Sequence, residues 1–135
     1  MDLTKQFPRS PYDMNAGLVI VGRTTDKCRA QLAGTLGEYH YDCPLDQLLF
    51  EFLSIDAEVF SAQARRLDTD AELAEWIDRE LPRDAVEKDA FNNQMRHRKP
   101  QDEESLASFK KWQKDLSRED YFTYFDHLDA DEGRF

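Results

Sequence analysis

Side chains that could bind an anion gather near one predicted helix start. Arg23 and Lys27 are four residues apart, and Asp26 lies between them. Asp26 is a good N-cap residue, and the apolar spacing that follows predicts a helix over about residues 25–36. The first turn of a helix attracts negative charge, and arginine binds carboxylate or phosphate groups through paired hydrogen bonds. The pattern indicates an anion pocket, with helix capping plus surface ion pairing as the alternative.

The segment from Glu38 to Asp42 alternates polar and aromatic residues. If it is extended, His40 shares one face with the two carboxylates, while Tyr39 and Tyr41 share the other face. An imidazole beside carboxylates is suited to act as a general base or to bind a metal ion. A polar strand face beside tyrosines of the core is the alternative. No second histidine stands at a metal-ligand spacing, so neither a metal ion nor another cofactor is predicted.

Cys43 precedes Pro44 at the predicted start of another helix. The positive end of a helix dipole favours a thiolate, so Cys43 is a candidate nucleophile. A small cysteine packed in the core is the alternative interpretation. Cys28 lies fifteen residues earlier, a spacing that matches no paired-cysteine metal or redox motif. We therefore expect both thiols to stay reduced.

These residues support three hypotheses about function. The first is a non-enzymatic module that binds a small anion or a protein partner in a polar concavity. Its predicted ligand-binding residues are Arg9, Arg23, Asp26, Lys27, Tyr39, His40 and Tyr41. The second is an enzyme, with His40 and a flanking carboxylate as acid and base or with Cys43 as the nucleophile. The third is a structural homodimer that buries aromatic helix faces between its two copies.

The elements around these residues are predicted to be helices. The chain has the length of one domain, with an extended arm and a buried apolar segment over residues 1–23 and a helical body over residues 24–135. A β-branched run before Gly22 predicts at most one short extended segment, without an obvious partner. Capping residues and apolar stripes predict an all-α fold of about six to seven amphipathic helices. After the helix at 25–36, these cover about residues 45–53, 56–66, 70–81, 84–98, 103–116 and 118–128.

Charge narrows the classes of partner. The chain has 28 acidic and 18 basic side chains, a net charge of −10, so its surface repels nucleic acids and anionic lipids. The basic run from Arg96 to Lys99 is interpreted as cations at a helix C-terminus, with phosphate binding as the alternative. Asp129 and Asp131 belong to an acidic C-terminal tail that could pair with arginines of the first segment. With no signal peptide and no apolar run long enough for a membrane helix, a cytoplasmic location is expected.

Several short motifs, in combination, resemble one bacterial family. They are Pro8-Arg9-Ser10-Pro11-Tyr12, Gly17-Leu18, Gly22-Arg23 with Asp26-Lys27, Gly37-Glu38-Tyr39-His40-Tyr41, and the ending Phe125-Asp126 to Asp129-Ala130-Asp131-Glu132-Gly133-Arg134. Over nearly its whole length the chain resembles the family of domain of unknown function 5069. This resemblance implies a small stand-alone soluble bacterial protein, and it carries over no reaction, cofactor or catalytic residue. One departure is Thr24-Thr25, where similar sequences have larger apolar residues, so a pocket there would be more polar.

Overall fold

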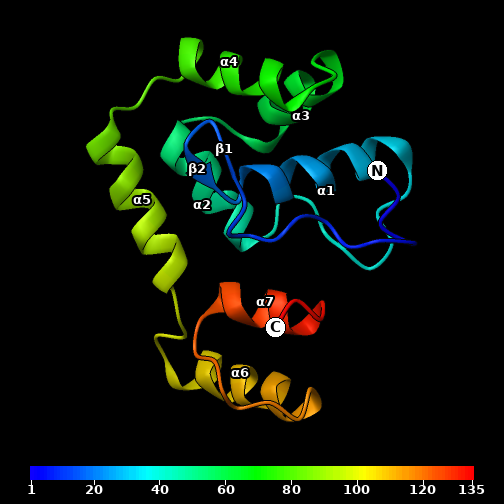
Figure 1. The fold of residues 1–135 in the computed structure, drawn as a ribbon, viewed down its shortest axis with the longest axis vertical. Coiled ribbons are helices and arrows are strands. Elements are labelled where there is room, and N and C mark those ends of the chain that lie inside the picture. The colour runs from blue at the N-terminus through cyan, green and yellow to red at the C-terminus, as the bar shows by residue number, and fades with distance from the viewer.

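Seven helices and one short antiparallel hairpin make up the fold, as the computed structural model of residues 1–135 shows (Figure 1). The prediction of an all-α fold is confirmed. The elements are β1 (Met14–Asn15), β2 (Leu18–Val19), α1 (Val21–Ala33), α2 (Pro44–Leu53), α3 (Ala57–Arg66), α4 (Asp70–Glu80), α5 (Ala85–His97), α6 (Glu103–Asp115) and α7 (Tyr124–Asp131). No helix combines the length and the apolar character that crossing a membrane requires.

Side-chain caps fix the starts of helices α3 to α6. Asp56, Thr69, Asp84 and Asp102 each accept a hydrogen bond from the backbone amide three residues later, at 2.7–3.1 Å. Such a cap satisfies one of the amide groups that the first turn leaves without a partner. Helices α3 to α6 therefore begin and end within one residue of the predicted bounds.

Helix α1 differs from the prediction at both ends. It begins at Val21 instead of residue 25, and its N-cap Ile20 has φ 66° and makes no side-chain capping bond. It ends at Ala33, because the C-cap Gly34, with φ 72°, closes the helix before residue 36. Arg23 and Lys27 therefore lie within the first two turns of α1, and the predicted cap at Asp26 does not form.

The last helix also differs from the prediction over 118–128. Ser117 has φ 55° just after α6, and the chain then runs irregularly until Thr123 caps α7. Ser117 and Asp120 have the three-residue spacing of a capping box, but no such box forms, since Ser117 has a left-handed φ and Asp120 pairs with Arg118 at 2.7 Å. Helix α7 is therefore displaced along the sequence and reaches Asp131.

The β-branched run does have a strand partner. Met14 pairs with Val19 and Asn15 with Leu18 in antiparallel register. The buried side chain of Asn92 on α5 holds this hairpin, since it accepts from the amide of Val19 and donates to the carbonyl of the turn, both at 3.0 Å. This partner strand could not be predicted from the sequence, because two residues are too few for a strand pattern.

Two apolar clusters hold the helices together. The larger one combines the hairpin with buried side chains of α1 to α5, and Phe125 of α7 joins it. A smaller one, formed by Phe109, Tyr121 and Ala130, packs α6 and the segment before α7 together. Helices α6 and α7 lie together at one end of the long axis (Figure 1). This arrangement leaves the start of α2 and the end of α5 facing α6 and α7.

Candidate functional site

Arg9 and Asp26 are paired with each other on one side of α1. The guanidinium Nη2 of Arg9 lies 3.0 Å from Asp26 Oδ1, and the backbone amide of Arg9 donates to Asp26 Oδ2 at 2.9 Å. Arg9 also bonds Asp70 at the start of α4, and this bond lowers the pKa of the Asp70 carboxyl. These two predicted ligand-binding residues therefore tie the N-terminal arm to α1 and α4.

Arg23 forms a buried ion pair with Glu132. Its two guanidinium nitrogens donate to the two carboxylate oxygens at 2.9 and 2.7 Å, and the side chains are only 4% and 1% exposed. Tyr39 donates its hydroxyl to the same carboxylate at 2.8 Å, and Arg134 bonds it from the other side. The acidic C-terminal segment thus pairs with an early arginine, as the sequence suggested, but through Glu132 rather than Asp129 or Asp131.

Lys27 forms a second buried ion pair, with Asp46 of α2. The ammonium Nζ lies 2.8 Å from Asp46 Oδ2, and neither side chain is more than 6% exposed. Asp46 Oδ1 accepts the hydroxyl of Thr24 at 2.6 Å. Lys27 Nζ also donates to the carbonyl of His40 at 3.1 Å. Arg23 and Lys27 thus each have a carboxylate that balances their charge.

Four of the predicted ligand-binding residues line one small cavity. Arg23, Lys27, Tyr39 and His40 contribute to its wall, and its volume is about 190 Å³. We call it the α1 cavity. Tyr41 lies elsewhere, because its hydroxyl donates to the carbonyl of Ala57 at 2.6 Å. The structure therefore brings Arg23, Lys27, Tyr39 and His40 together and leaves Arg9, Asp26 and Tyr41 outside this cavity.

The segment containing His40 is a pair of turns instead of a strand. Asp42 has φ 66°, which breaks the extended alternation. Glu38, His40 and Asp42 are all exposed, and no hydrogen bond joins the imidazole to either carboxylate. The geometry expected of a histidine base positioned by a carboxylate is therefore not formed.

Cys43 lies at the N-terminus of α2, as predicted. Its sulfur accepts the backbone amide of Asp46 in a reciprocal capping box and lies 3.2 Å from Lys27 Nζ. The side chain is half-buried and contributes both to the α1 cavity and to a larger hollow beside it. Cys28, in contrast, is fully buried, and burial raises the pKa of its thiol.

The larger hollow, here called the cleft, lies where α2 and the end of α5 face α6 and α7. Its volume is about 580 Å³, close to that of pockets that hold small organic ligands. Leucine and aromatic side chains from α2, α6 and α7 form much of its wall: Leu45, Leu48, Trp112, Tyr124, His127 and Leu128. Trp112 is 41% exposed, so this aromatic surface is accessible from solvent.

Two cations stand at the cleft. Arg98 and Lys99 both contribute to its wall, both are exposed, and neither side chain has a carboxylate partner within the chain. One carboxylate, Asp102, also lines the cleft, and its Oδ1 accepts the amide of Ser105 at 2.7 Å. The formal charge of these three side chains is positive, opposite in sign to the net charge of −10.

His127 contributes a flat ring to the cleft. Its ring stacks on Trp112 with a centroid distance of 5.0 Å, and its Nδ1 lies 2.8 Å from the hydroxyl of Tyr121. Burial lowers the pKa of this imidazole and so favours its neutral form. The ring therefore extends the aromatic surface of the cleft.

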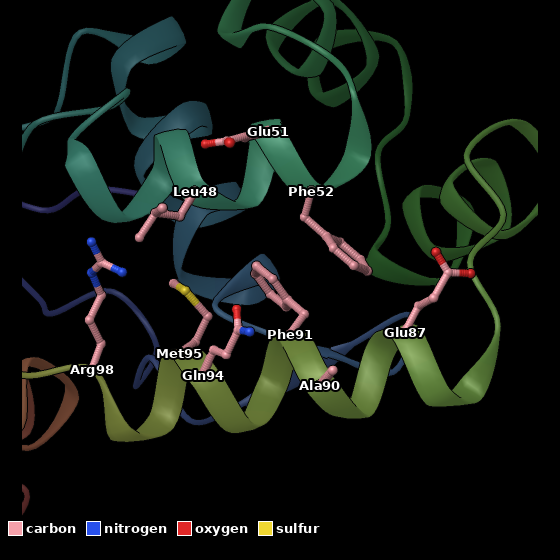
Figure 2. Close-up of a pocket in the computed structure, with 9 residues that line it drawn as sticks. All are labelled: Leu48, Glu51, Phe52, Glu87, Ala90, Phe91, Gln94, Met95 and Arg98. Atoms are coloured by element: carbon pink, nitrogen blue, oxygen red, sulfur yellow. The ribbon is translucent and has the colours of Figure 1, made fainter.

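A groove of about 460 Å³ lies between α2 and α5, next to the cleft (Figure 2). Phe52 and Phe91 stack across it with a centroid distance of 4.5 Å, and Met95 lies beside them. Leu48 and Arg98 line both the groove and the cleft. We call this hollow the α2–α5 groove.

The cleft is not predicted from the sequence, although two features that line it, a basic run and a tryptophan, are visible there. From the sequence, the run from Arg96 to Lys99 is interpreted as a helix end in preference to a phosphate-binding site, and Trp112 belongs to the apolar stripe of the helix predicted at 103–116. The run does follow the last turn of α5, but Arg98 and Lys99 also face the start of α2 across the cleft. A cationic run between two aromatic helices is the signal that could have located the site.

No three histidine, cysteine, aspartate or glutamate side chains lie close enough together to hold a metal ion. Buried polar side-chain atoms all have hydrogen-bond partners. The acidic and basic side chains of the interior are therefore engaged with each other, and the cleft is where unpaired cations and accessible aromatic rings meet.

Comparison with protein families identifies the chain. A family model described as domain of unknown function (DUF5069) matches residues 5–134. No curated protein matches the chain. The family match spans nearly the whole sequence and includes both ion pairs of α1, the cleft and the groove. The protein therefore belongs to the DUF5069 family.

Proposed function

We propose that the protein binds a small organic anion in the cleft. The observation that carries this proposal is the presence of two unpaired cations, Arg98 and Lys99, beside an accessible aromatic and aliphatic wall. Ligand pockets typically combine an apolar lining with a few polar groups that orient the ligand. The proposal retains the leading hypothesis from the sequence, which is binding of a small anion. It differs in location, because the proposed site is the cleft instead of the α1 cavity.

Charge favours the cleft over the α1 cavity. An anion in the α1 cavity would compete with Glu132 for Arg23 and with Asp46 for Lys27, and both pairs are buried. Charge-assisted hydrogen bonds to an arginine are stronger than neutral ones, so an unpaired guanidinium is the better anchor. Arg98 meets this condition.

The walls favour a ligand with an apolar or aromatic body. Leu45, Leu48 and Leu128 offer aliphatic surface, and Trp112 offers the face of an indole. A flat ring placed against these side chains would bury apolar area on both partners, at about 25 cal/mol per Å². The ligand class is therefore an aromatic or branched carboxylate or a similar organic anion.

Arg98→Ala and Lys99→Ala are each expected to weaken binding of 4-phenylbutyrate about tenfold, because each removes a charge-assisted contact. Binding is measured by NMR titration of the indole N–H of Trp112. The indole of Trp76, 6% exposed in the core, is the internal reference. The neutral amide of the same probe is expected to bind about tenfold more weakly than the acid, for the same reason.

Matched controls are Lys110→Ala and Lys111→Ala on α6. They remove the same charge from exposed positions outside the cleft and the α2–α5 groove. If acid and amide bind equally well, or if the control variants lose as much affinity as Arg98→Ala, the cleft is not an anion site.

A second candidate function is nucleophilic chemistry at Cys43. The observation that favours it is the 3.2 Å contact from Lys27 Nζ to a sulfur that borders the cleft. A cationic neighbour and a helix N-terminus are the surroundings in which reactive cysteines occur. A cytoplasmic location, where thiols stay reduced, suits this proposal, and both cysteines are free.

Iodoacetamide is expected to alkylate Cys43 in the folded protein and to leave Cys28 unmodified, because Cys28 is fully buried. Intact-mass spectrometry counts the adducts, and Cys43→Ser is expected to abolish labelling until denaturant is added. The nucleophile proposal requires Cys43 to react faster than N-acetylcysteine in the same buffer. A slower reaction would leave Cys43 as an ordinary capping residue.

A further inference from the structure

We propose that the cleft and the α2–α5 groove together bind the C-terminal end of another polypeptide, with its terminal carboxylate at Arg98 and Lys99. This inference rests on the proposed function, because the terminal carboxylate would be the bound organic anion. It adds the partner class: an extended segment with apolar side chains and a free C-terminus.

The two hollows adjoin each other, because they share wall residues. Leu48 and Arg98 belong to the walls of both, and in Figure 2 Arg98 lies at the end of α5 nearest the start of α2. Their volumes are about 460 and 580 Å³. A ligand anchored at Arg98 can therefore extend along the groove while its anionic end stays in the cleft.

The length of the groove suits a short extended chain. The groove follows α5 from Glu87 to Arg98, eleven residues along the helix. At 1.5 Å per residue this distance is about 16 Å. An extended chain advances about 3.3 Å per residue, so about five residues would cover it.

Charges along the groove give the bound segment a direction. Arg98 and Lys99 stand at one end, and Glu87 stands at the other. Glu51, on α2, adds a second carboxylate, and neither glutamate has a basic partner. A segment with a terminal carboxylate and a lysine or arginine about five residues before its last residue would complement both ends.

The lining of the groove favours a peptide over an acyl chain. Phe52, Phe91 and Met95 give it an apolar surface that accepts apolar side chains. Gln94 and Glu51 also line it and can hydrogen-bond to a peptide backbone, whereas an acyl chain has no groups that could use these bonds. Capture of a terminal carboxylate with side chains in neighbouring pockets is an established mode of peptide recognition.

The test is fluorescence anisotropy of the whole chain with a labelled hexapeptide of sequence lysine-alanine-leucine-alanine-leucine-phenylalanine. The peptide with a free C-terminus is expected to bind about tenfold more tightly than its C-terminal amide. Ala90→Gln places a larger side chain in the groove and is expected to weaken peptide binding about tenfold. The same variant is expected to leave 4-phenylbutyrate binding in the cleft unchanged.

Ala107→Gln on α6 is the matched control, since it makes the same change at an exposed helical position outside both hollows. The peptide proposal is overturned, with the proposed function intact, if 4-phenylbutyrate binds through Arg98 while acid and amide peptides bind alike. It is also overturned if decanoate binds as tightly as the peptide and is weakened equally by Ala90→Gln, which would indicate an acyl ligand. If neither peptide nor 4-phenylbutyrate binds, both proposals fail.

Discussion

Glu132→Gln is expected to lower the free energy of unfolding by about 3–5 kcal/mol, the range for removing one partner of a buried ion pair. Glu132 and Arg23 are 1% and 4% exposed, and two hydrogen bonds join them. After the substitution the guanidinium of Arg23 keeps its charge in the interior without a compensating carboxylate. Urea unfolding followed by tryptophan fluorescence measures the loss.

Asp131→Asn is the matched control, because it removes the same charge from an exposed neighbouring position. We expect it to change stability little, as surface substitutions usually do. Adding Arg23→Met to Glu132→Gln is expected to recover part of the lost stability, since no buried charge then stays unpaired. Equal urea midpoints for Glu132→Gln and Asp131→Asn would contradict the assignment of a buried ion pair.

The same pair predicts how stability depends on pH. Burial alone would raise the pKa of the Glu132 carboxyl, but hydrogen bonds from Arg23, Tyr39 and Arg134 hold this pKa below its ordinary value. A carboxyl with a lowered pKa in the folded state contributes full stability above its unfolded pKa, about 4.3 for glutamate. That contribution is lost as pH falls through the folded pKa. The difference between wild type and Glu132→Gln is therefore expected to be constant near neutral pH and to shrink below about pH 4.

Asp46→Asn is expected to lower the melting temperature by on the order of 10–20 °C, from a loss of about 3–5 kcal/mol. Asp46 is fully buried and accepts hydrogen bonds from Lys27 and Thr24 at 2.8 and 2.6 Å. It also accepts the backbone amides of Asp42 and Cys43, which cap α2. Its replacement leaves an unpaired buried ammonium and weakens the start of α2. Differential scanning calorimetry measures the change.

Asp42→Asn supplies the comparison for Asp46→Asn. Asp42 is exposed and lies four residues earlier, and only its backbone amide takes part in the network. Its melting temperature is expected to stay close to that of wild type. The double variant Lys27→Met with Asp46→Asn is expected to melt above Asp46→Asn alone, because it removes the unpaired charge. If it melts at the same temperature, the ion pair does not account for the loss.

These two predictions affect how ligand binding is tested. Truncating Lys27 would leave Asp46 as an uncompensated buried carboxylate, and truncating Arg23 would leave the buried Glu132 with Arg134 as its only cationic partner. If such a variant failed to bind, the cause would be unfolding of the protein instead of the loss of a ligand contact. Arg98 and Lys99 are exposed and unpaired, so their variants separate binding from stability.

Much of the fold could be predicted from the sequence because most helix starts have a local signal. Asp56, Thr69 and Asp84 are caps whose partner is three residues away, and such contacts are visible in sequence. The start of α1 has no such signal, since Ile20 adopts φ 66° without a side-chain cap. Its conformation is held by the surrounding fold, including the bond from its amide to the carbonyl of Pro11. Ser117 misled the prediction because the same residue type favours caps at helix starts.

Less of the candidate site could be predicted, because its partners are distant in sequence. The sequence predicts Arg23 and Lys27 as ligand-binding residues from their charge and spacing, and both line one cavity with Tyr39 and His40. Their carboxylate partners are 109 and 19 residues away, and no spacing rule relates them. The cleft combines short pieces of α2, α6 and α7 that have no motif of their own. The topology of the folded chain alone places them side by side.

The distance along the chain between Arg23 and Glu132 also determines when their ion pair can form during synthesis. Glu132 is added 109 residues after Arg23. At about 5–20 residues per second, a ribosome needs roughly 5–20 seconds to make that stretch. Throughout this time α1 carries a guanidinium whose native partner does not yet exist, so the arginine must remain in water. Closure of the interior around α1 is therefore a late step, completed when the end of α7 arrives.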